Sequence, residues 1–93
     1  MKIVATSGYF DPLHVGHLEC LELAKQLGDK LIVIVNSDLQ AKLKKGESFM
    51  KQEDRMKIIL ALKYVDEVFL SIDKDKSQCD SLRYLKPDIF AKG

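Results

Sequence analysis

Short apolar runs alternate along the chain with segments whose apolar residues recur every three or four positions. The runs predict strands at 2–6, 31–35, 68–72 and 88–92. The run at 31–35 consists of five consecutive apolar residues, most of them β-branched, and shows no polar alternation. A strand of this kind is covered on both faces, as in a parallel sheet with helices on each side.

The segments between the strands predict helices at 16–27, 52–63 and 77–85. The residues expected to face the core are Cys20, Leu21, Ala24 and Leu27, then Met56, Ile59 and Leu60, and finally Cys79, Leu82 and Leu85. Gly28 is placed to end the first helix in a left-handed turn, and Pro87 to end the third.

The alternation of strands and helices predicts an α/β fold. We expect a Rossmann-like, three-layer α/β/α arrangement with a four-stranded parallel sheet and right-handed crossovers. The first strand should lie centrally, beside the point where strand order reverses, so that the loop after it enters the ligand crevice. Because the chain ends directly after the fourth strand, we expect a single domain over 1–93 that is incomplete at its C-terminus. The lysine-rich stretch 39–50 should be a mobile loop after at most one helical turn, since Gly46 interrupts any helix there.

The loop between the first strand and the first helix carries the candidate chemistry. His14 and His17 lie three residues apart at the expected helix start, so their side chains can point the same way. A helix N-terminus offers free backbone N–H groups and a partial positive charge, which suit a phosphate. Gly16 carries no side chain, so a ligand can approach the backbone between the histidines. This pattern favours phosphoryl or nucleotidyl chemistry over metal binding.

Composition narrows the function further. The 93 residues carry a net charge of +1, with 46% apolar and 31% charged residues, which is typical of a soluble domain and gives no support for bulk binding to nucleic acid or membrane. No apolar run is long enough to span a bilayer. Cys20 and Cys79 lack metal-ligand spacing and are expected to be reduced core residues of a cytoplasmic protein.

Several segments together resemble a known family. They are GYFDPLHVGH at 8–17, VNSD at 35–38, Lys44, EDR at 53–55, YVDEV at 64–68, and KPDI at 86–89 followed by Lys92 and Gly93. In this order and spacing they resemble the HxGH nucleotidyltransferases, specifically the cytidylyltransferase-like branch, with HxGH at the start of the first helix. The chain looks similar to glycerol-3-phosphate cytidylyltransferase, to the nucleotidyl-transferring domain of the ADP-heptose synthesis enzyme and to archaeal FAD synthetase.

The resemblance implies transfer of a nucleoside monophosphate from CTP or ATP, with CTP favoured, to a phosphorylated small molecule. The acceptor phosphate would attack in line, with no covalent intermediate, and pyrophosphate would be released. Mg²⁺ would accompany the nucleotide. His14, His17 and Lys44 would be the catalytic residues. The implied nucleotide- or phosphate-binding residues are Tyr9, Phe10, Asp11, Gly16, Arg55, Lys92 and Gly93, and Asp38 would contact the substrate. No protein-held metal is expected, and the protein should form a homodimer. Two departures stand out: Tyr9 replaces the Thr or Val of many members, and the family's later nucleotide-binding segment does not follow Gly93.

Each assignment has a structural alternative. The histidines can simply cap a helix, and Lys42 and Lys45 can be solvated surface charges. Arg55 can pair with Glu53 or Asp54, Asp38 can cap the next helix, and Asp11 can form a turn.

The whole chain also has alternatives to a complete enzyme. It can be a nucleotide-binding half-domain without turnover, or an assembly module whose sheet edge pairs with a second copy. A class I aminoacyl-tRNA synthetase, which shares a related signature, is disfavoured by the absence of a basic surface.

Overall fold

A computed structural model describes residues 1–46, 50–75 and 77–91. The strands are β1 (Ile3–Gly8), β2 (Lys30–Val35), β3 (Glu67–Leu70) and β4 (Ile89–Phe90). The helices are α1 (Val15–Lys25), α2 (Asp38–Lys45), α3 (Gln52–Leu60) and α4 (Cys79–Leu85). Lys92 and Gly93, which were predicted to bind the nucleotide, lie outside the described residues, as does the side chain of Lys45.

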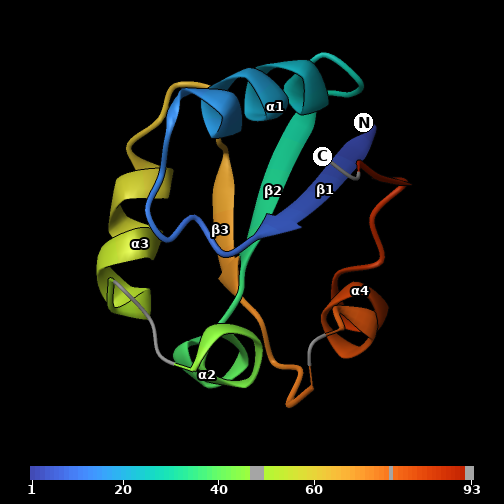
Figure 1. Ribbon diagram of the computed structural model, residues 1–93. Helices are drawn as coiled ribbons and strands as arrows, with labels where there is room; N and C mark the ends of the chain where they lie inside the picture. Colours follow the sequence, from blue (N-terminus) through green and yellow to red (C-terminus); the bar gives the residue numbers. More distant parts are fainter. Residues whose placement is uncertain (47–49, 76, 92–93) are drawn as a thin grey trace.

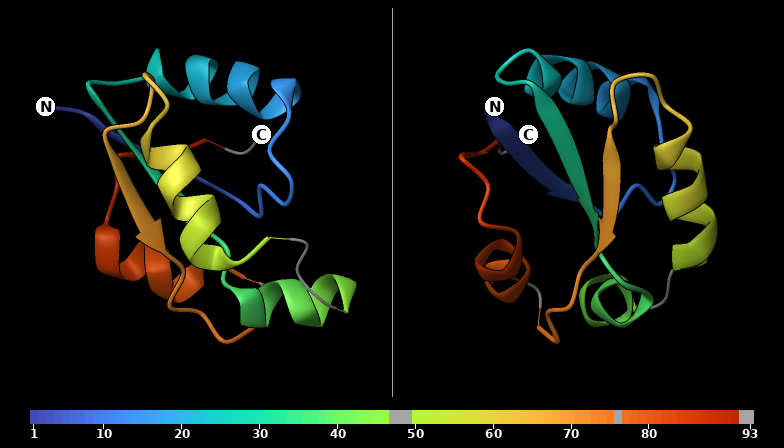
Figure 2. Two further views of the ribbon diagram at one scale, coloured as in Figure 1. Left: turned by 90° about the vertical axis from the view of Figure 1, so that its left-hand side faces the viewer. Right: turned by 180° about the vertical axis from the view of Figure 1, so that it is seen from behind.

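The four strands form one parallel sheet in the order β3-β2-β1-β4. β1 therefore lies between β2 and β4, at the point where strand order reverses. In Figures 1 and 2, α3 and α4 lie on opposite sides of the sheet, while α2 lies beyond the carboxyl ends of the strands. The predicted Rossmann-like α/β fold and the central position of the first strand are confirmed.

The main core lies between the sheet and the helices α1 and α3. Alternate sheet residues Val4, Leu31, Val33 and Val35 pack with Leu21, Ala24, Ile59, Val65 and Phe10. Because side chains alternate across a strand, Ala5, Ile32 and Ile34 are directed to the opposite face, and they are buried as well. The strand at 31–35 is covered on both faces, as its apolar sequence predicts.

Several residues expected in the core are exposed instead. Leu21 and Ala24 of α1 are buried, whereas Cys20 and Leu27 are exposed and line an open pocket beside Thr6 and Ala91. On α3 the buried side is made by Arg55 and Ile59, one turn apart, so Leu60 points outward.

On α4 the prediction for Cys79 was also wrong: it is exposed, and the buried residue is Ser81. The buried carboxylate of Asp73 accepts hydrogen bonds from the backbone N–H groups of Asp80 and Ser81 at 2.7 and 3.0 Å, and from the Ser81 hydroxyl at 2.7 Å. This polar anchor, rather than an apolar stripe, fixes the start of α4.

The stretch 39–50 begins with two turns of helix, not with a mobile loop. Ser37 caps α2 in a capping box with Gln40, and Gly46 ends the helix with a φ of +93°. Gly28 is not left-handed, contrary to the prediction. A side chain there would lie 2.7 Å from Val4 Cγ2 and 2.8 Å from the Lys2 carbonyl oxygen, so close packing explains this glycine. None of the described helices has the length and apolarity needed to cross a membrane.

Candidate active site

The loop from β1 to α1 brings both histidines to the start of the helix. His14 is the N-cap residue, and its Nδ1 accepts a hydrogen bond from the Gly16 backbone N–H at 3.1 Å. His17, three residues later, accepts the His14 backbone N–H on its own Nδ1, also at 3.1 Å. The two side chains thus form a capping box, with histidine in both positions. The capping alternative for the histidines is therefore realised in the structure.

Capping leaves the other ring nitrogens available for chemistry. A neutral imidazole whose Nδ1 accepts a hydrogen bond carries its proton on Nε2. In both histidines the Nε2–H is therefore a donor on the side away from the backbone. The ring centroids lie 3.9 Å apart with planes inclined by 31°, so the two rings lie against each other.

The surroundings of His17 favour the neutral ring. Partial burial, reinforced by the neighbouring His14, lowers the pKa of His17 below its usual value. The Phe10 ring contacts it edge-on with centroids 5.0 Å apart. The neutral form of His17, with its proton on Nε2, is therefore favoured at neutral pH.

Gly16 lies directly beneath the His14 ring. A Cβ at this position would be 2.8 Å from His14 Cε1 and 3.0 Å from Nδ1, which is closer than ordinary van der Waals contact. The absence of a side chain therefore allows the His14 ring to fold back onto the helix start. This space is used by the histidine itself, a feature that the sequence pattern did not reveal.

Lys44, on the last turn of α2, lies over the ring of Tyr9 in the β1–α1 loop. Its Nζ is 4.7 Å from the ring centroid, a cation–π contact. Burial raises the pKa of Tyr9, and the charge of Arg55 opposes that effect. The tyrosine that departs from the family pattern is thus the residue that holds the predicted catalytic lysine. Lys42 is exposed, in agreement with a solvated surface charge.

The two acidic candidate residues, Asp11 and Asp38, contact residues from other segments of the chain. Asp11 Oδ1 accepts the Met50 backbone N–H at 2.6 Å. Asp38 is the first residue of α2 rather than its cap, and its Oδ1 pairs with Arg55 Nη2 at 2.7 Å. The predicted alternative for Arg55, an ion pair with Glu53 or Asp54, is replaced by this pair with a residue from another element. Direct substrate contacts of Asp11, Asp38 and Arg55 stay predictions.

Two residues that connect the loops around Asp11 and Arg55 were not predicted. Met50 uses its backbone N–H and carbonyl, and Asn36 uses its carbonyl, to join the loops. Backbone groups leave no signature in the sequence. The position of Asn36 at the carboxyl end of β2 was the one available signal.

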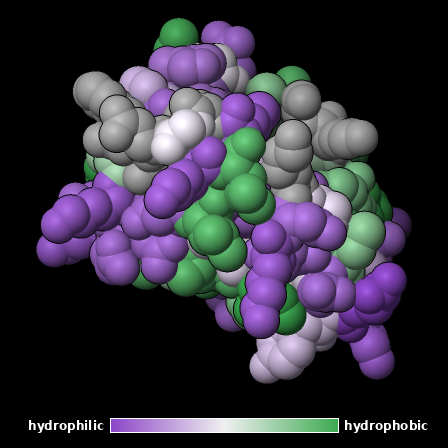
Figure 3. All heavy atoms as spheres, turned by 60° about the horizontal axis from the view of Figure 1, so that its bottom comes forward, coloured by the Kyte–Doolittle hydropathy of each residue, from purple (hydrophilic) through white to green (hydrophobic). Residues whose placement is uncertain are grey.

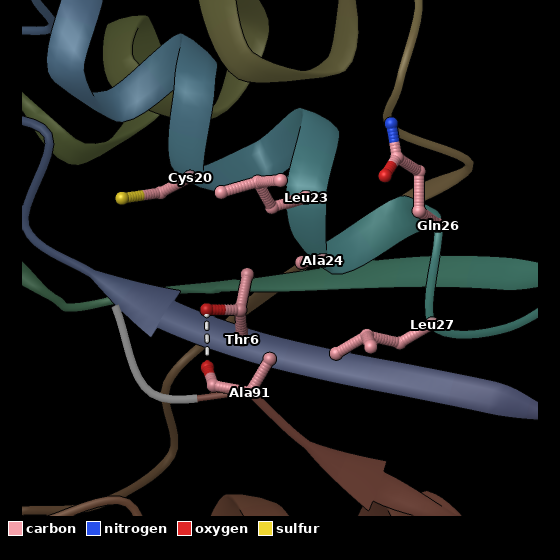
Figure 4. A pocket seen from close by; sticks show the side chains of 7 residues that line it. All are labelled: Thr6, Cys20, Leu23, Ala24, Gln26, Leu27 and Ala91. Carbon is pink, nitrogen blue, oxygen red and sulfur yellow. Dashed lines mark hydrogen bonds between the residues drawn. The ribbon is translucent and has the colours of Figure 1, made fainter.

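The molecular surface adds two observations. Seen from the end where α2 lies, the surface is mostly hydrophilic with a hydrophobic strip through its middle (Figure 3). A cavity of about 430 Å³ lies between α1, β1 and Ala91, and its wall includes Thr6, Cys20 and Leu23 (Figure 4). It contains neither histidine, so we place the site by the paired imidazoles rather than by this hollow. Within residues 1–46, 50–75 and 77–91, no three His, Cys, Asp or Glu side chains converge as metal ligands.

Known proteins are similar in sequence to this chain over nearly its whole length. FAD synthase of Pyrococcus abyssi is 42% identical over 91 residues, which are 97% of this chain and 61% of that protein. Bifunctional protein HldE of Campylobacter jejuni (strain RM1221) is 44% identical over 93 residues, 99% of this chain and 20% of that protein. The chain thus spans about three fifths of the length of the FAD synthase.

The fold and the sequence also agree with a solved structure and with a family description. The crystal structure of the lipopolysaccharide core biosynthesis protein from Thermoplasma volcanium GSS1 matches with a TM-score of 0.89 and 33% identity, over 97% of this chain and 72% of that one. A family model described as cytidylyltransferase-like matches residues 5–93, including both histidines. The chain therefore belongs to the cytidylyltransferase-like family.

Proposed function

We propose that this chain carries a nucleotidyl-transfer site, which moves a nucleoside monophosphate from CTP or ATP to a phosphorylated small molecule and releases pyrophosphate. The observation that carries the proposal is the pair of adjacent imidazoles whose Nδ1 atoms are held by the backbone. This arrangement fixes two Nε2–H donors at a helix N-terminus, where a phosphate is favoured.

The reaction we propose has one displacement step. An oxygen of the acceptor phosphate attacks the α-phosphorus of the nucleotide, and the bond from that phosphorus to the bridging oxygen of the β-phosphate breaks. The departing electron pair leaves with pyrophosphate. His14 and His17 donate to oxygens on the transferring phosphorus, while Lys44 neutralises charge on the leaving phosphates. Because the donors are already oriented, little reorganisation is needed as charge develops.

Mg²⁺ is proposed to arrive with the nucleotide. It prefers phosphate oxygens and water to an all-protein cage, and it supplies charge neutralisation when bound. Asp11, close to the histidine loop, is the carboxylate that we expect nearest to the ion or the acceptor.

Other residues receive supporting roles. Tyr9 and Phe10 orient Lys44 and His17 through the ring contacts described above. Gly16 admits the His14 ring, and Asp38 is proposed to face the substrate. Lys92 and Gly93 remain proposed nucleotide contacts on the basis of the family resemblance.

The acceptor is proposed from the relatives. The name FAD synthase indicates a flavin nucleotide and an adenine nucleotide in that protein, so FMN with ATP is one pair to test. The family resemblance adds glycerol 3-phosphate and heptose 1-phosphate, with CTP as the other nucleotide. We also propose that the protein acts in the cytoplasm as a homodimer, and light scattering at several concentrations tests the dimer.

The test measures pyrophosphate release with each nucleotide and acceptor in Mg²⁺. The matched variants are His17→Gln, whose amide retains the capping acceptor, and His17→Ala, which loses it. We expect both to lose about 10²–10³-fold in kcat, while only His17→Ala loses helix stability. Retention of full turnover in His17→Ala, which has no donor at this position, would exclude a phosphate role for this imidazole.

A second candidate is a nucleotide-binding half-domain without turnover. The observation that favours it is that both histidines cap α1 through Nδ1, a structural role that needs no turnover. It predicts that CTP or ATP binds in a calorimetric titration while no pyrophosphate is released with any acceptor. Turnover by the chain alone would exclude it.

A further inference from the structure

Arg55 is the largest fully buried side chain among the described residues, with 1% of its surface exposed. A buried guanidinium is stable only where acceptors replace the water around its N–H groups. Nε donates to the Met50 carbonyl oxygen at 3.0 Å, and Nη1 donates to the carbonyl oxygens of Tyr9 and Asn36, each at 2.7 Å. Nη2 donates to Asp38 Oδ1 at 2.7 Å. Four of the five guanidinium N–H groups are thus occupied by the protein itself.

These acceptors come from three different segments. Tyr9 follows β1, Asn36 and Asp38 follow β2, and Met50 precedes α3, which carries Arg55. One guanidinium therefore joins the two loops at the carboxyl ends of the central strands to the start of a helix. In such sheets the ligand crevice lies at these ends.

The Tyr9 carbonyl that Arg55 binds belongs to the loop that carries the proposed phosphate site. The Tyr9 ring carries the Lys44 ammonium. The next residue, Phe10, has a φ of +52° and places its buried ring against His17. Arg55 thus fixes the Tyr9–Phe10 segment, whose two rings contact Lys44 and His17.

We propose that Arg55 is a positioning residue of the site, which holds the loops around the phosphates and does not itself bind a phosphate; this rests on the proposed function. A bidentate grip on a phosphate requires two free N–H groups facing the same way. The four hydrogen bonds of Arg55 leave at most one of its N–H groups for a phosphate. Lysine cannot take over the role, because its three donors on one nitrogen cannot reach four acceptors in different directions.

The first experiment needs no nucleotide. Arg55→Lys is compared with Arg83→Lys, which alters the chain's other arginine, an exposed residue on α4 that pairs with Asp80. In amide NMR spectra of the free protein, we expect Arg55→Lys to shift the signals at 9–11, 36–38 and 50 and to speed their hydrogen exchange. The signals of β1 and β2 should stay in place, and Arg83→Lys should move none of these signals. Unchanged loop signals in Arg55→Lys would overturn the proposal.

A second measurement leaves Arg55 unaltered and does not depend on whether Arg55→Lys folds. With two arginines in the chain, the Arg55 Nε–H signal is assigned by elimination in Arg83→Lys. We expect this signal to be protected from solvent exchange, whereas that of exposed Arg83 is not. Protection should persist when CTP or ATP is added with Mg²⁺. Loss of protection on adding a nucleotide would show that the guanidinium leaves its carbonyls, and would refute the positioning role.

Turnover then separates positioning from binding. We expect kcat of Arg55→Lys to fall by about tenfold to a hundredfold, as for other small misplacements of reacting groups, with the KM for the nucleotide changed far less. A large rise in KM at unchanged kcat would instead indicate a direct phosphate contact. If the unaltered protein binds neither nucleotide, the proposed function fails while the loop measurements still decide the structural role of Arg55.

Discussion

Replacing Gly16 with alanine adds one methyl group beneath the His14 ring. The new Cβ would lie 2.8 Å from Cε1 and 3.0 Å from Nδ1 of that ring, and ordinary contacts are about 3.5–4.0 Å. The ring is the end of a rotatable side chain, so we expect it to swing away by about 1 Å rather than to unfold the helix. The hydrogen bond from the Gly16 N–H to His14 Nδ1 would be lost with it.

The effect of Gly16→Ala on stability should be small because two contributions oppose each other. Gly16 is the second residue of α1 and has no positive φ, so alanine fits the backbone and stabilises the helix by about 0.5–1 kcal/mol. Losing the cap costs about 0.5–2 kcal/mol. We therefore expect the free energy of unfolding to change by no more than about 1 kcal/mol.

The effect on turnover should be much larger. A displacement of about 1 Å in a reacting group can reduce the rate about a hundredfold. Urea unfolding followed by circular dichroism measures the change in the free energy of unfolding, and pyrophosphate release measures the change in turnover. Gly28→Ala is the matched control, since its Cβ would meet the Lys2 carbonyl oxygen at 2.8 Å and should cost stability without touching His14. Gly16→Ala with undiminished turnover would show that the observed His14 position is not the working one.

Three further predictions concern the loops and the pH dependence. Tyr9→Leu should weaken triphosphate binding about two- to fivefold in calorimetry by removing the cation–π contact with Lys44, whereas Tyr9→Phe should not; equal effects would refute a role for the ring. Asp73→Ala should cost about 1–3 kcal/mol in urea unfolding, because buried donors on α4 lose their acceptor, and the exposed Asp75→Ala serves as the control. Because the folded pKa of His17 lies below its ordinary 6.5, the unfolded chain binds this proton more tightly, so the stability that His17 contributes is complete above that value and declines at lower pH. Unfolding at about pH 7.5 and about pH 5.5 should therefore differ less in His17→Gln than in the unaltered protein, and identical pH dependence would contradict the assignment.

The sheet could be predicted from sequence because its signal is local. An uninterrupted apolar run such as 31–35, in which four of five residues are β-branched, favours a strand that is buried on both faces. The length of helix α2 was underestimated because three lysines and Gly46 are typical of a mobile loop. Ser37 and Gln40, spaced as a capping box, were the available signal for its start.

The candidate site was predictable only in part. Two histidines at a helix start indicated phosphate chemistry, and the structure adds that the same rings cap the helix through Nδ1. These roles do not compete, because they use different ring nitrogens. The burial of Arg55 had no sequence signal, since a charged residue on an amphipathic helix ordinarily faces solvent. Its partners are carbonyl groups from distant segments, which only the tertiary fold brings together.

The two sides of the central strand are joined very unevenly. β1 pairs with β2 over six residues, whereas within the part of the chain that the structure describes it pairs with β4 over two, Val4 with Ile89 and Ala5 with Phe90. Local opening follows the weaker ladder, so the β4 edge should detach at a lower free energy than the β1–α1–β2 unit. Native-state hydrogen exchange should therefore show early release at Ile89–Phe90 while the His14 loop stays formed. The β1–α1–β2 unit should therefore be the most resistant to local unfolding. The pocket beside Ala91 is bounded on one side by the β4 edge, which should open first.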